Sequence, residues 1–400
     1  MIAGAESKPD ARPGRLYRGM RRTLFCAGLV ALTLASCAPA NRPPPAHPAA
    51  PAAPRAATAS THEKPPEIDL EPLRIRVVTG PEGEQTLEHY DARMLLDRGN
   101  EALAEGRWDD ALRIYDQLVA EFPHASVLPL AHFNAAQALE GKRQWDKAIA
   151  RYRKVISSGA EPRDATDAAV RIGVIDSELE RWGDAAAQFE ALLARTDLEP
   201  GDRIEAMARL GYVLVEQKAY VRAEKVLSEA VSYYSRVAQT RELETNYYVA
   251  MAYYYLANIP HRQAREVPLR VTSTKDEQLH QDLEAKRKLL MLAYDRYVVA
   301  LQRRNPYWAT AAGYQMSQMF KDFWDDVVTA PLPANLSARE AGFYKRALHD
   351  YVRDYLQKAM FGHTKNVELA QAYRTSTEWS RASEIRAKQI AEILSREGRG

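Results

Sequence analysis

Cysteine is almost absent from this 400-residue chain, in which only Cys26 and Cys37 occur. Two cysteines exclude a disulfide-dense scaffold and any zinc site built from four cysteines. An excess of one charge is missing too, because 55 basic residues nearly balance 53 acidic residues. This balance argues against a strongly basic nucleic-acid-binding protein, and we expect no nucleic acid among its partners.

Catalytic motifs are also missing from the sequence. The nine histidines are scattered, and none lies in the His-Glu-x-x-His spacing of a zinc protease. The chain has no glycine-rich phosphate-binding loop and no Gly-x-Ser-x-Gly nucleophile turn. Acidic pairs such as Asp325 and Asp326 are typical of a solvated helix face. We therefore expect no enzymatic activity, no cofactor and no metal.

An apolar run of 12 residues covers positions 24–35, interrupted only by Thr33, and Arg21 and Arg22 precede it. The run is too short to span a bilayer, whereas its length and its basic flank are typical of a signal peptide. It ends in Leu-Ala-Ser followed by Cys37, which resembles the lipobox of bacterial lipoproteins. The alternative is a buried helix with an incidental cysteine.

The lipobox resemblance implies that residues 1–36 are a signal peptide and that Cys37 is acylated. It also implies a lipid-anchored protein of the bacterial outer membrane that faces the periplasm, since Ala38 rather than an aspartate follows the cysteine. Met20 is a second candidate start, because Met20 to Cys37 alone makes a compact signal. Loss of residues 1–36 removes six positive and two negative charges, so the net charge of +2 becomes −2.

The segment that follows, 37–66, is expected to be a disordered tether. Residues 38–66 contain nine prolines and ten alanines. Such a composition cannot bury a core and favours extended conformations. Residues 67–90 are expected to form an extended lead-in to the folded part.

The rest of the chain repeats itself with a period of 37 or 38 residues. One column of aligned positions holds small residues, which allow two helices to approach closely. A large aromatic residue lies three positions before each small residue, and a bulky apolar residue lies four positions after it. A second small column lies twelve residues before the first. The small column is Ala111, Ala148, Ala185 and Ala223; the aromatic column is Trp108, Trp145, Trp182 and Tyr220; the bulky column is Tyr115, Tyr152, Phe189 and Leu227; the second small column is Gly99, Ala136, Gly173 and Gly211.

This pattern resembles the tetratricopeptide repeat, a helix-turn-helix unit that stacks into a right-handed superhelix. The resemblance implies an all-α solenoid with four units over 91–237, degenerate repeats over 238–330 and capping helices over 331–400. Within 238–330 we expect an insertion at 259–275. The stretched units are similar to those of periplasmic tetratricopeptide lipoproteins, including the barrel-assembly and Tol–Pal accessory families.

Three local features refine this picture. Ser337 and Glu340 have the spacing of a capping box that begins a helix running to about Phe361, with a last helix from about 365 to 396. Residues 72–78 alternate with period two, and 268–272 look similar. We hypothesise that these two segments pair as a two-stranded ribbon, the alternative being two unrelated surface loops.

Without catalytic motifs, function is expected to lie in surfaces. In tetratricopeptide repeats the first helix of each pair lines the concave groove, which suits an extended or helical peptide. The alternative is that the aliphatic members only pack against neighbouring helices. The residues expected to line the groove, which should be apolar with amide edges, are Leu96, Asn100, Phe133, Gln137, Val170, Val174 and Tyr212.

A second candidate surface is aromatic. Tyrosines crowd positions 233–255, and exposed tyrosines are typical interface anchors, although each could equally be core with its hydroxyl reaching water. The tyrosines expected at this interface are Tyr247, Tyr248, Tyr254 and Tyr255.

These features together favour a membrane-anchored interaction scaffold of the bacterial envelope, with envelope proteins or peptides as partners. The alternative is a periplasmic carrier or sensor that binds a small apolar ligand or a peptidoglycan fragment. A stoichiometric protein partner would distinguish the first from the second.

Overall fold

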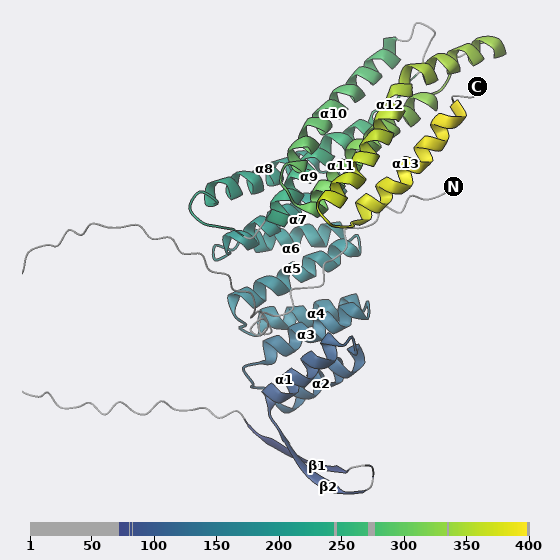
Figure 1. The fold of residues 1–400 in the computed structure, drawn as a ribbon. Helices are drawn as coiled ribbons and strands as arrows, with labels where there is room; N and C mark the ends of the chain where they lie inside the picture. Colours follow the sequence, from purple (N-terminus) through teal and green to yellow (C-terminus); the bar gives the residue numbers. More distant parts are fainter. Residues whose placement is uncertain are drawn as a thin grey trace, which may run out of the picture. The chain divides into compact units, whose positions relative to one another are not determined.

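The structure, a computed structural model, describes residues 72–79, 81, 83–243, 246–270, 277–333 and 336–397. The signal peptide, Cys37 and the tether therefore lie outside the described residues. The described residues divide into two units, 72–92 and 93–397. The described parts of the two units are a β-hairpin and a helical stack (Figure 1).

The β-hairpin consists of β1 (Arg74–Thr79) and β2 (Gln85–Tyr90), paired antiparallel with Arg74 opposite Tyr90 and Thr79 opposite Gln85. Arg76 donates from Nε to Glu88 Oε2 at 2.8 Å, across the pair. The hypothesis that 72–78 pairs with 268–272 was wrong. The strand pairs with its near neighbour instead, residues 268–270 have no regular structure, and 271 and 272 lie outside the described residues.

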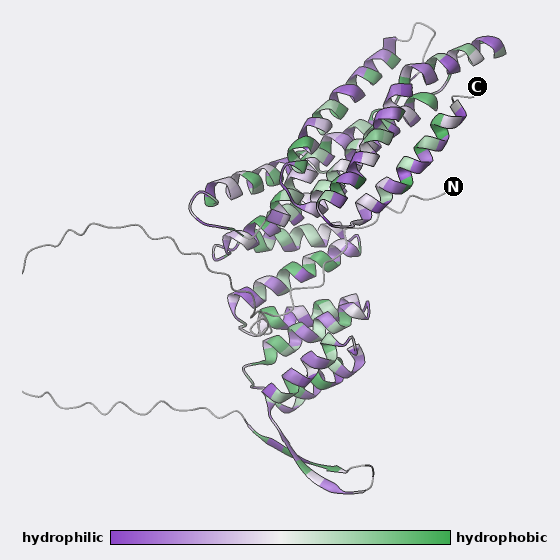
Figure 2. Cartoon of the chain, in the orientation of Figure 1, coloured by the Kyte–Doolittle hydropathy of each residue, from purple (hydrophilic) through white to green (hydrophobic). Residues whose placement is uncertain are grey.

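The helical stack begins with four helix pairs. They are α1 (Ala92–Ala104) with α2 (Trp108–Glu121), α3 (Leu128–Gly141) with α4 (Trp145–Ser157), α5 (Pro162–Glu178) with α6 (Trp182–Leu193), and α7 (Pro200–Glu216) with α8 (Tyr220–Val237). Each second helix begins at a residue of the aromatic column, and all four alanines of the small column are fully buried. Apolar residues recur along these helices (Figure 2).

The two small columns allow each helix pair to close tightly. A Cβ atom added at Gly99 would lie 2.4 Å from Tyr115, and one at Gly173 would lie 2.6 Å from Phe189. Contacts below 3.0 Å do not occur for real Cβ atoms, so the aromatic ring occupies the space that a side chain would need. The repeat columns are thus confirmed as the packing units of the stack.

A common turn joins the two helices of each pair. Two residues before each second helix, the backbone has a positive φ, of 73° at Gly106, 56° at Arg143, 56° at Glu180 and 58° at Lys218. The next amide bonds back to the carbonyl five residues earlier, as in the bond of 2.9 Å from Arg107 N to Ala102 O. This is the Schellman motif, which ends a helix by satisfying its last carbonyls.

The remaining helices form the C-terminal part of the stack. They are α9 (Asn246–Glu266), α10 (Glu277–Leu301), α11 (Pro306–Val328), α12 (Ala338–Ala372) and α13 (Glu378–Glu397). Helices α9 and α10 pack together, as do α11 with α12 and α12 with α13. The described chain thus folds as an all-α repeat solenoid followed by capping helices, preceded by the hairpin.

The insertion expected at 259–275 was predicted to begin too early, which was wrong, because α9 continues through Pro260 to Glu266. A proline inside a helix frees the carbonyl four residues before it, here that of Leu256. Arg296 Nη1 donates to Leu256 O at 3.0 Å, so the lost bond is replaced from α10.

The capping box of Ser337 and Glu340 is confirmed at the start of α12. The break expected near residue 362 was wrong, because α12 continues to Ala372. Gly362 serves close packing there, since a Cβ atom at this position would lie 2.5 Å from Ser317 Oγ.

Candidate functional site

The first helices of successive pairs contact one another, α3 with α5, α5 with α7 and α7 with α9. We call the surface formed by α1, α3, α5, α7 and α9 the first-helix face. Polar side chains bridge α1 to α3, α3 to α5 and α7 to α9. The first bridge joins α1 and α3, where Asn100 Oδ1 accepts from Tyr115 OH at 2.8 Å and from Asn134 Nδ2 at 2.6 Å.

The second bridge joins α3 and α5. Arg171 Nε donates to Glu140 Oε1 at 3.1 Å, and Tyr152 OH donates to the same oxygen at 2.6 Å. Burial raises the pKa of Tyr152, which keeps its phenol protonated and able to donate. The Arg171 and Glu140 side chains keep 17% and 11% of their surface exposed, so the pair is only partly accessible.

The third and fourth bridges join α7 and α9. Arg209 donates to Glu205 Oε1 at 2.8 Å and to Tyr248 OH at 3.2 Å, and its guanidinium lies 5.2 Å from the Tyr248 ring centroid. Arg262 holds Glu216 through two bonds, of 2.5 and 3.1 Å. Bidentate and charge-assisted bonds of this kind are the strong ones, so these arginines are held in place before any partner binds.

The apolar residues expected to line the groove lie deeper than expected. Leu96, Phe133, Val170 and Val174 are buried, and Phe133 packs edge-on against Tyr152 at 5.1 Å. The polar or amphipathic residues expected there, Asn100, Gln137 and Tyr212, are half-buried. The exposed part of the first-helix face therefore consists of arginine, glutamate, amide and tyrosine groups, which corrects the expectation of an apolar lining.

The expected aromatic interface divides in two. Tyr254 and Tyr255 are 4% and 6% exposed and pack against Trp308, with ring centroids 5.0 and 5.8 Å away. They are core residues, which corrects their assignment as interface anchors. Tyr247 and Tyr248 are half-buried, and Tyr248 lies on the first-helix face through its contact with Arg209.

Two buried polar clusters escaped the sequence analysis. In the first, Tyr297 OH accepts from Asn258 at 3.2 Å and lies 3.2 Å from His261 Nδ1, and burial lowers the pKa of His261 to about 3. In the second, His363 Nδ1 lies 3.3 Å from Ser383 Oγ. Burial, helped by Arg386, lowers the pKa of His363 to about 4. Both histidines are neutral core residues, and spacing alone carried no signal for them.

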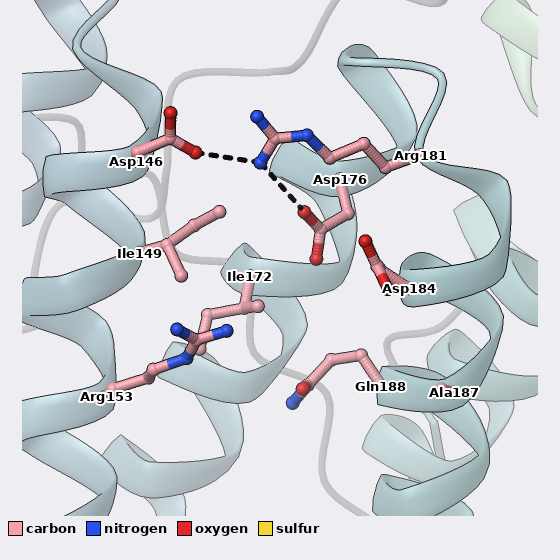
Figure 3. Close-up of a pocket in the computed structure, with 9 residues that line it drawn as sticks. All are labelled: Asp146, Ile149, Arg153, Ile172, Asp176, Arg181, Asp184, Ala187 and Gln188. Carbon is pink, nitrogen blue, oxygen red and sulfur yellow. Dashed lines mark hydrogen bonds and ion pairs between the residues drawn. The ribbon is translucent and has the colours of Figure 1, made fainter.

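A pocket of about 430 Å³ opens between the second helices α4 and α6, over α5 (Figure 3). Ile149 and Ile172 supply its apolar part. Arg181 Nη1 lies 2.8 Å from Asp146 Oδ1 and 3.8 Å from Asp176 Oδ1. The other lining residues are Arg153, Asp184, Ala187 and Gln188.

Within the part of the chain that the structure describes, no group of three or more His, Cys, Asp or Glu side chains is arranged to hold a metal ion. None of the described helices combines the length and the apolar character needed to cross a membrane.

Comparison with known protein families matches residues 96–168 and 170–238 to the tetratricopeptide repeat. The matched segments cover the helix pairs described above, and the repeat columns lie within them. A comparison with curated proteins finds no significant relative.

Several solved structures resemble the chain at low identity. MamA (residues 41 to the end) from Desulfovibrio magneticus RS-1 is 15% identical with a TM-score of 0.34, covering 54% of this chain and 97% of its own. BtubC from P. vanneervenii is 15% identical with a TM-score of 0.38, covering 72% and 93%. The Pseudomonas aeruginosa pilF structure is 13% identical with a TM-score of 0.37, covering 76% and 97%. Such low TM-scores carry no inference about function.

Proposed function

We propose that this tetratricopeptide-repeat protein is a scaffold of the bacterial cell envelope, anchored in the outer membrane through Cys37 and binding protein or peptide partners with its first-helix face. Tetratricopeptide repeats are protein-interaction scaffolds, and the matched repeats form the central part of this chain. The observation that carries the choice of surface is the set of half-buried polar bridges that join α1 to α3, α3 to α5 and α7 to α9.

The chemistry of the first-helix face suits a polar or charged peptide. Arginine and tyrosine are the residue types that most often dominate binding energy at interfaces. Holding a long side chain in place on binding costs roughly 0.5–1.5 kcal/mol. Arg171, Arg209 and Arg262 are already fixed by Glu140, Glu205 and Glu216, so much of that cost is met in the free protein.

The anchor is supported by the sequence alone. The apolar run, its basic flank and the small residues before Cys37 agree with a lipoprotein signal. A 29-residue tether rich in proline and alanine reaches at most about 90 Å at ~3.1 Å per residue. Such a reach would let an anchored solenoid meet partners across the periplasm.

Membrane fractionation tests the anchor. Cys37→Ala should move the protein from the membrane fraction to the soluble fraction without changing its melting temperature, because the helices that form the stack begin only at Ala92. Cys26→Ala is the matched control and should stay in the membrane fraction. A Cys37→Ala protein that remains fully membrane-bound would contradict the lipid anchor.

Affinity purification from cross-linked membranes tests the scaffold role against a carrier role. The scaffold predicts a stoichiometric protein partner that is lost with Tyr212→Ala, on the first-helix face, and kept with Tyr220→Ala, at the start of α8. Absence of any protein partner, together with a ligand-dependent rise in melting temperature, would favour the carrier instead.

A further inference from the structure

Asp176 occupies a position that the other three repeats fill with a buried apolar residue. The backbone amide of Arg181, five positions after Asp176, donates to the Asp176 carbonyl at 2.8 Å, and the corresponding bond occurs in each repeat. The equivalent residues are therefore Ala102, Leu139 and Leu214, all buried. Asp176 is buried as well, with 6% of its surface exposed. A carboxylate thus replaces a core side chain in one repeat only.

The Asp176 carboxylate is poorly compensated inside the protein. It makes no side-chain hydrogen bond among the described residues, and its nearest cation, Arg181 Nη1, lies 3.8 Å away. Arg181 is engaged more closely by Asp146, at 2.8 Å. Burial, and then the charge of Asp184, raise the pKa of Asp176. Burying a charged group without hydrogen bonds costs stability, so this placement is unfavourable for folding alone.

The Asp176 carboxylate lines the pocket between α4 and α6, where a ligand can reach it. Figure 3 shows the Asp176 carboxylate between the Arg181 guanidinium and Asp184, with Arg153 beyond Ile172. Arg153 and Asp184 form no ion pair in the described part of the chain, so both are available to a ligand. Three aspartates and two arginines line the pocket, which leaves one negative charge in excess.

We propose that this pocket binds a basic amino-acid residue, with its guanidinium or ammonium group between Asp176 and Asp184 and its carbonyl or carboxylate at Arg153 and Gln188. The cation would supply the hydrogen-bond donors that Asp176 lacks and would neutralise the excess charge. The residue could be a free amino acid or part of a peptide, since both carry this chemistry. The site lies between second helices and is separate from the first-helix face.

Calorimetric titration of the full chain with defined probes tests the ligand class. N-acetyl-L-arginine amide should bind saturably, and N-acetyl-L-citrulline amide, which has nearly the same shape without the charge, should bind at least tenfold more weakly. Tighter binding of free L-arginine than of the blocked amide identifies the free amino acid as ligand, and the reverse identifies a peptide residue. Equal binding of the arginine and citrulline amides, or no binding of any probe, would overturn the proposal.

Two variants separate a binding role from a structural one. Asp176→Leu restores the apolar residue of the other repeats and should raise the melting temperature while weakening binding more than tenfold. Asp184→Asn should weaken binding with the melting temperature unchanged, whereas Asp110→Asn, at the equivalent position of the first repeat, should leave binding unchanged. Arginine binding that survives both Asp176→Leu and Asp184→Asn would show that these carboxylates do not form the site.

Discussion

Single glycines decide how closely the two helices of a repeat approach. Gly173 faces the Phe189 ring, and a Cβ atom there would lie 2.6 Å from it. Gly173→Ala should therefore lower the free energy of unfolding by about 1–3 kcal/mol through overpacking. Gly183→Ala, at the start of α6 with nothing within 4 Å, is the control. It should be neutral or stabilising by up to about 1 kcal/mol, because alanine is the better helix former. Urea denaturation measures both, and equal effects would contradict the packing role.

Buried histidine makes stability depend on pH. The pKa of His363 is about 4 in the folded protein, against about 6.5 in an unfolded chain. The unfolded chain therefore binds the proton first. Stability is intact above pH 6.5 and falls by about 1.4 kcal/mol per pH unit between pH 6.5 and pH 4.

Replacing His363 should therefore change how the free energy of unfolding depends on pH. His363→Leu should lack the His363 contribution, so at pH 5 it should retain about 2 kcal/mol more of its pH 7 stability than the wild type does. The leucine should be tolerated, because His363 Nε2 has no hydrogen-bond partner among the described residues and Asn366 still donates to Ser383. Parallel urea titrations at pH 7 and pH 5 check this, and identical pH dependence of the two proteins would refute it.

The buried packing residues were predictable from the sequence, whereas the partners of the polar side chains were not. The small and bulky columns follow from a period of 37 or 38 residues, and they mark the interior of the stack correctly. The bridges from Arg171 to Glu140 and from Arg262 to Glu216 join residues 31 and 46 positions apart. Periodicity gives the face on which a side chain lies, but it does not identify the group that the side chain meets on another helix.

At the scale of elements, three of the turns inside the helix pairs hold a non-glycine residue in a left-handed backbone conformation, a strain that glycine would relieve. Arg143, Glu180 and Lys218 have positive φ values at positions where the first repeat has Gly106. A left-handed backbone costs roughly 1–2 kcal/mol for residues with a Cβ atom. Arg143→Gly and Lys218→Gly should each stabilise the protein by about 0.5–1 kcal/mol, after the added freedom of glycine in the unfolded chain is subtracted. Gly106→Ala should destabilise it by about 1 kcal/mol. Thermal unfolding of the three variants checks the order, and a loss of stability in both glycine variants would contradict it.

The element boundaries that sequence reasoning missed have physical causes. The strand at 74–79 pairs with 85–90 because closing a short loop costs less conformational entropy than joining segments about 190 residues apart. The insertion was expected from residue 259, but α9 continues to Glu266, and Arg296 replaces the bond that Pro260 removes. A donor from another helix cannot be read from the local sequence.

At the scale of the whole molecule, the repeat pattern was sufficient to predict an all-α solenoid, and the chemistry of its binding surface was not. The apolar residues expected in the groove are buried, and arginine, glutamate and tyrosine groups occupy the exposed part of the first-helix face. The first helices α3, α5 and α7 each pack against the second helix of their own pair and against that of the preceding pair, so an apolar residue at the expected position is buried in these contacts. The partner should therefore be recognised through charge and hydrogen bonds more than through apolar burial.

Site-specific photo-crosslinking in intact cells tests the scaffold account most directly. A photoreactive phenylalanine analogue would replace Gln137 or Tyr212 on the first-helix face, and Val221 in α8, which is 85% exposed, would serve as control. The account predicts a discrete protein adduct from positions 137 and 212 and none from position 221, although position 221 is the more accessible. An adduct from position 221 alone, or none from positions 137 and 212, would contradict binding through the first-helix face.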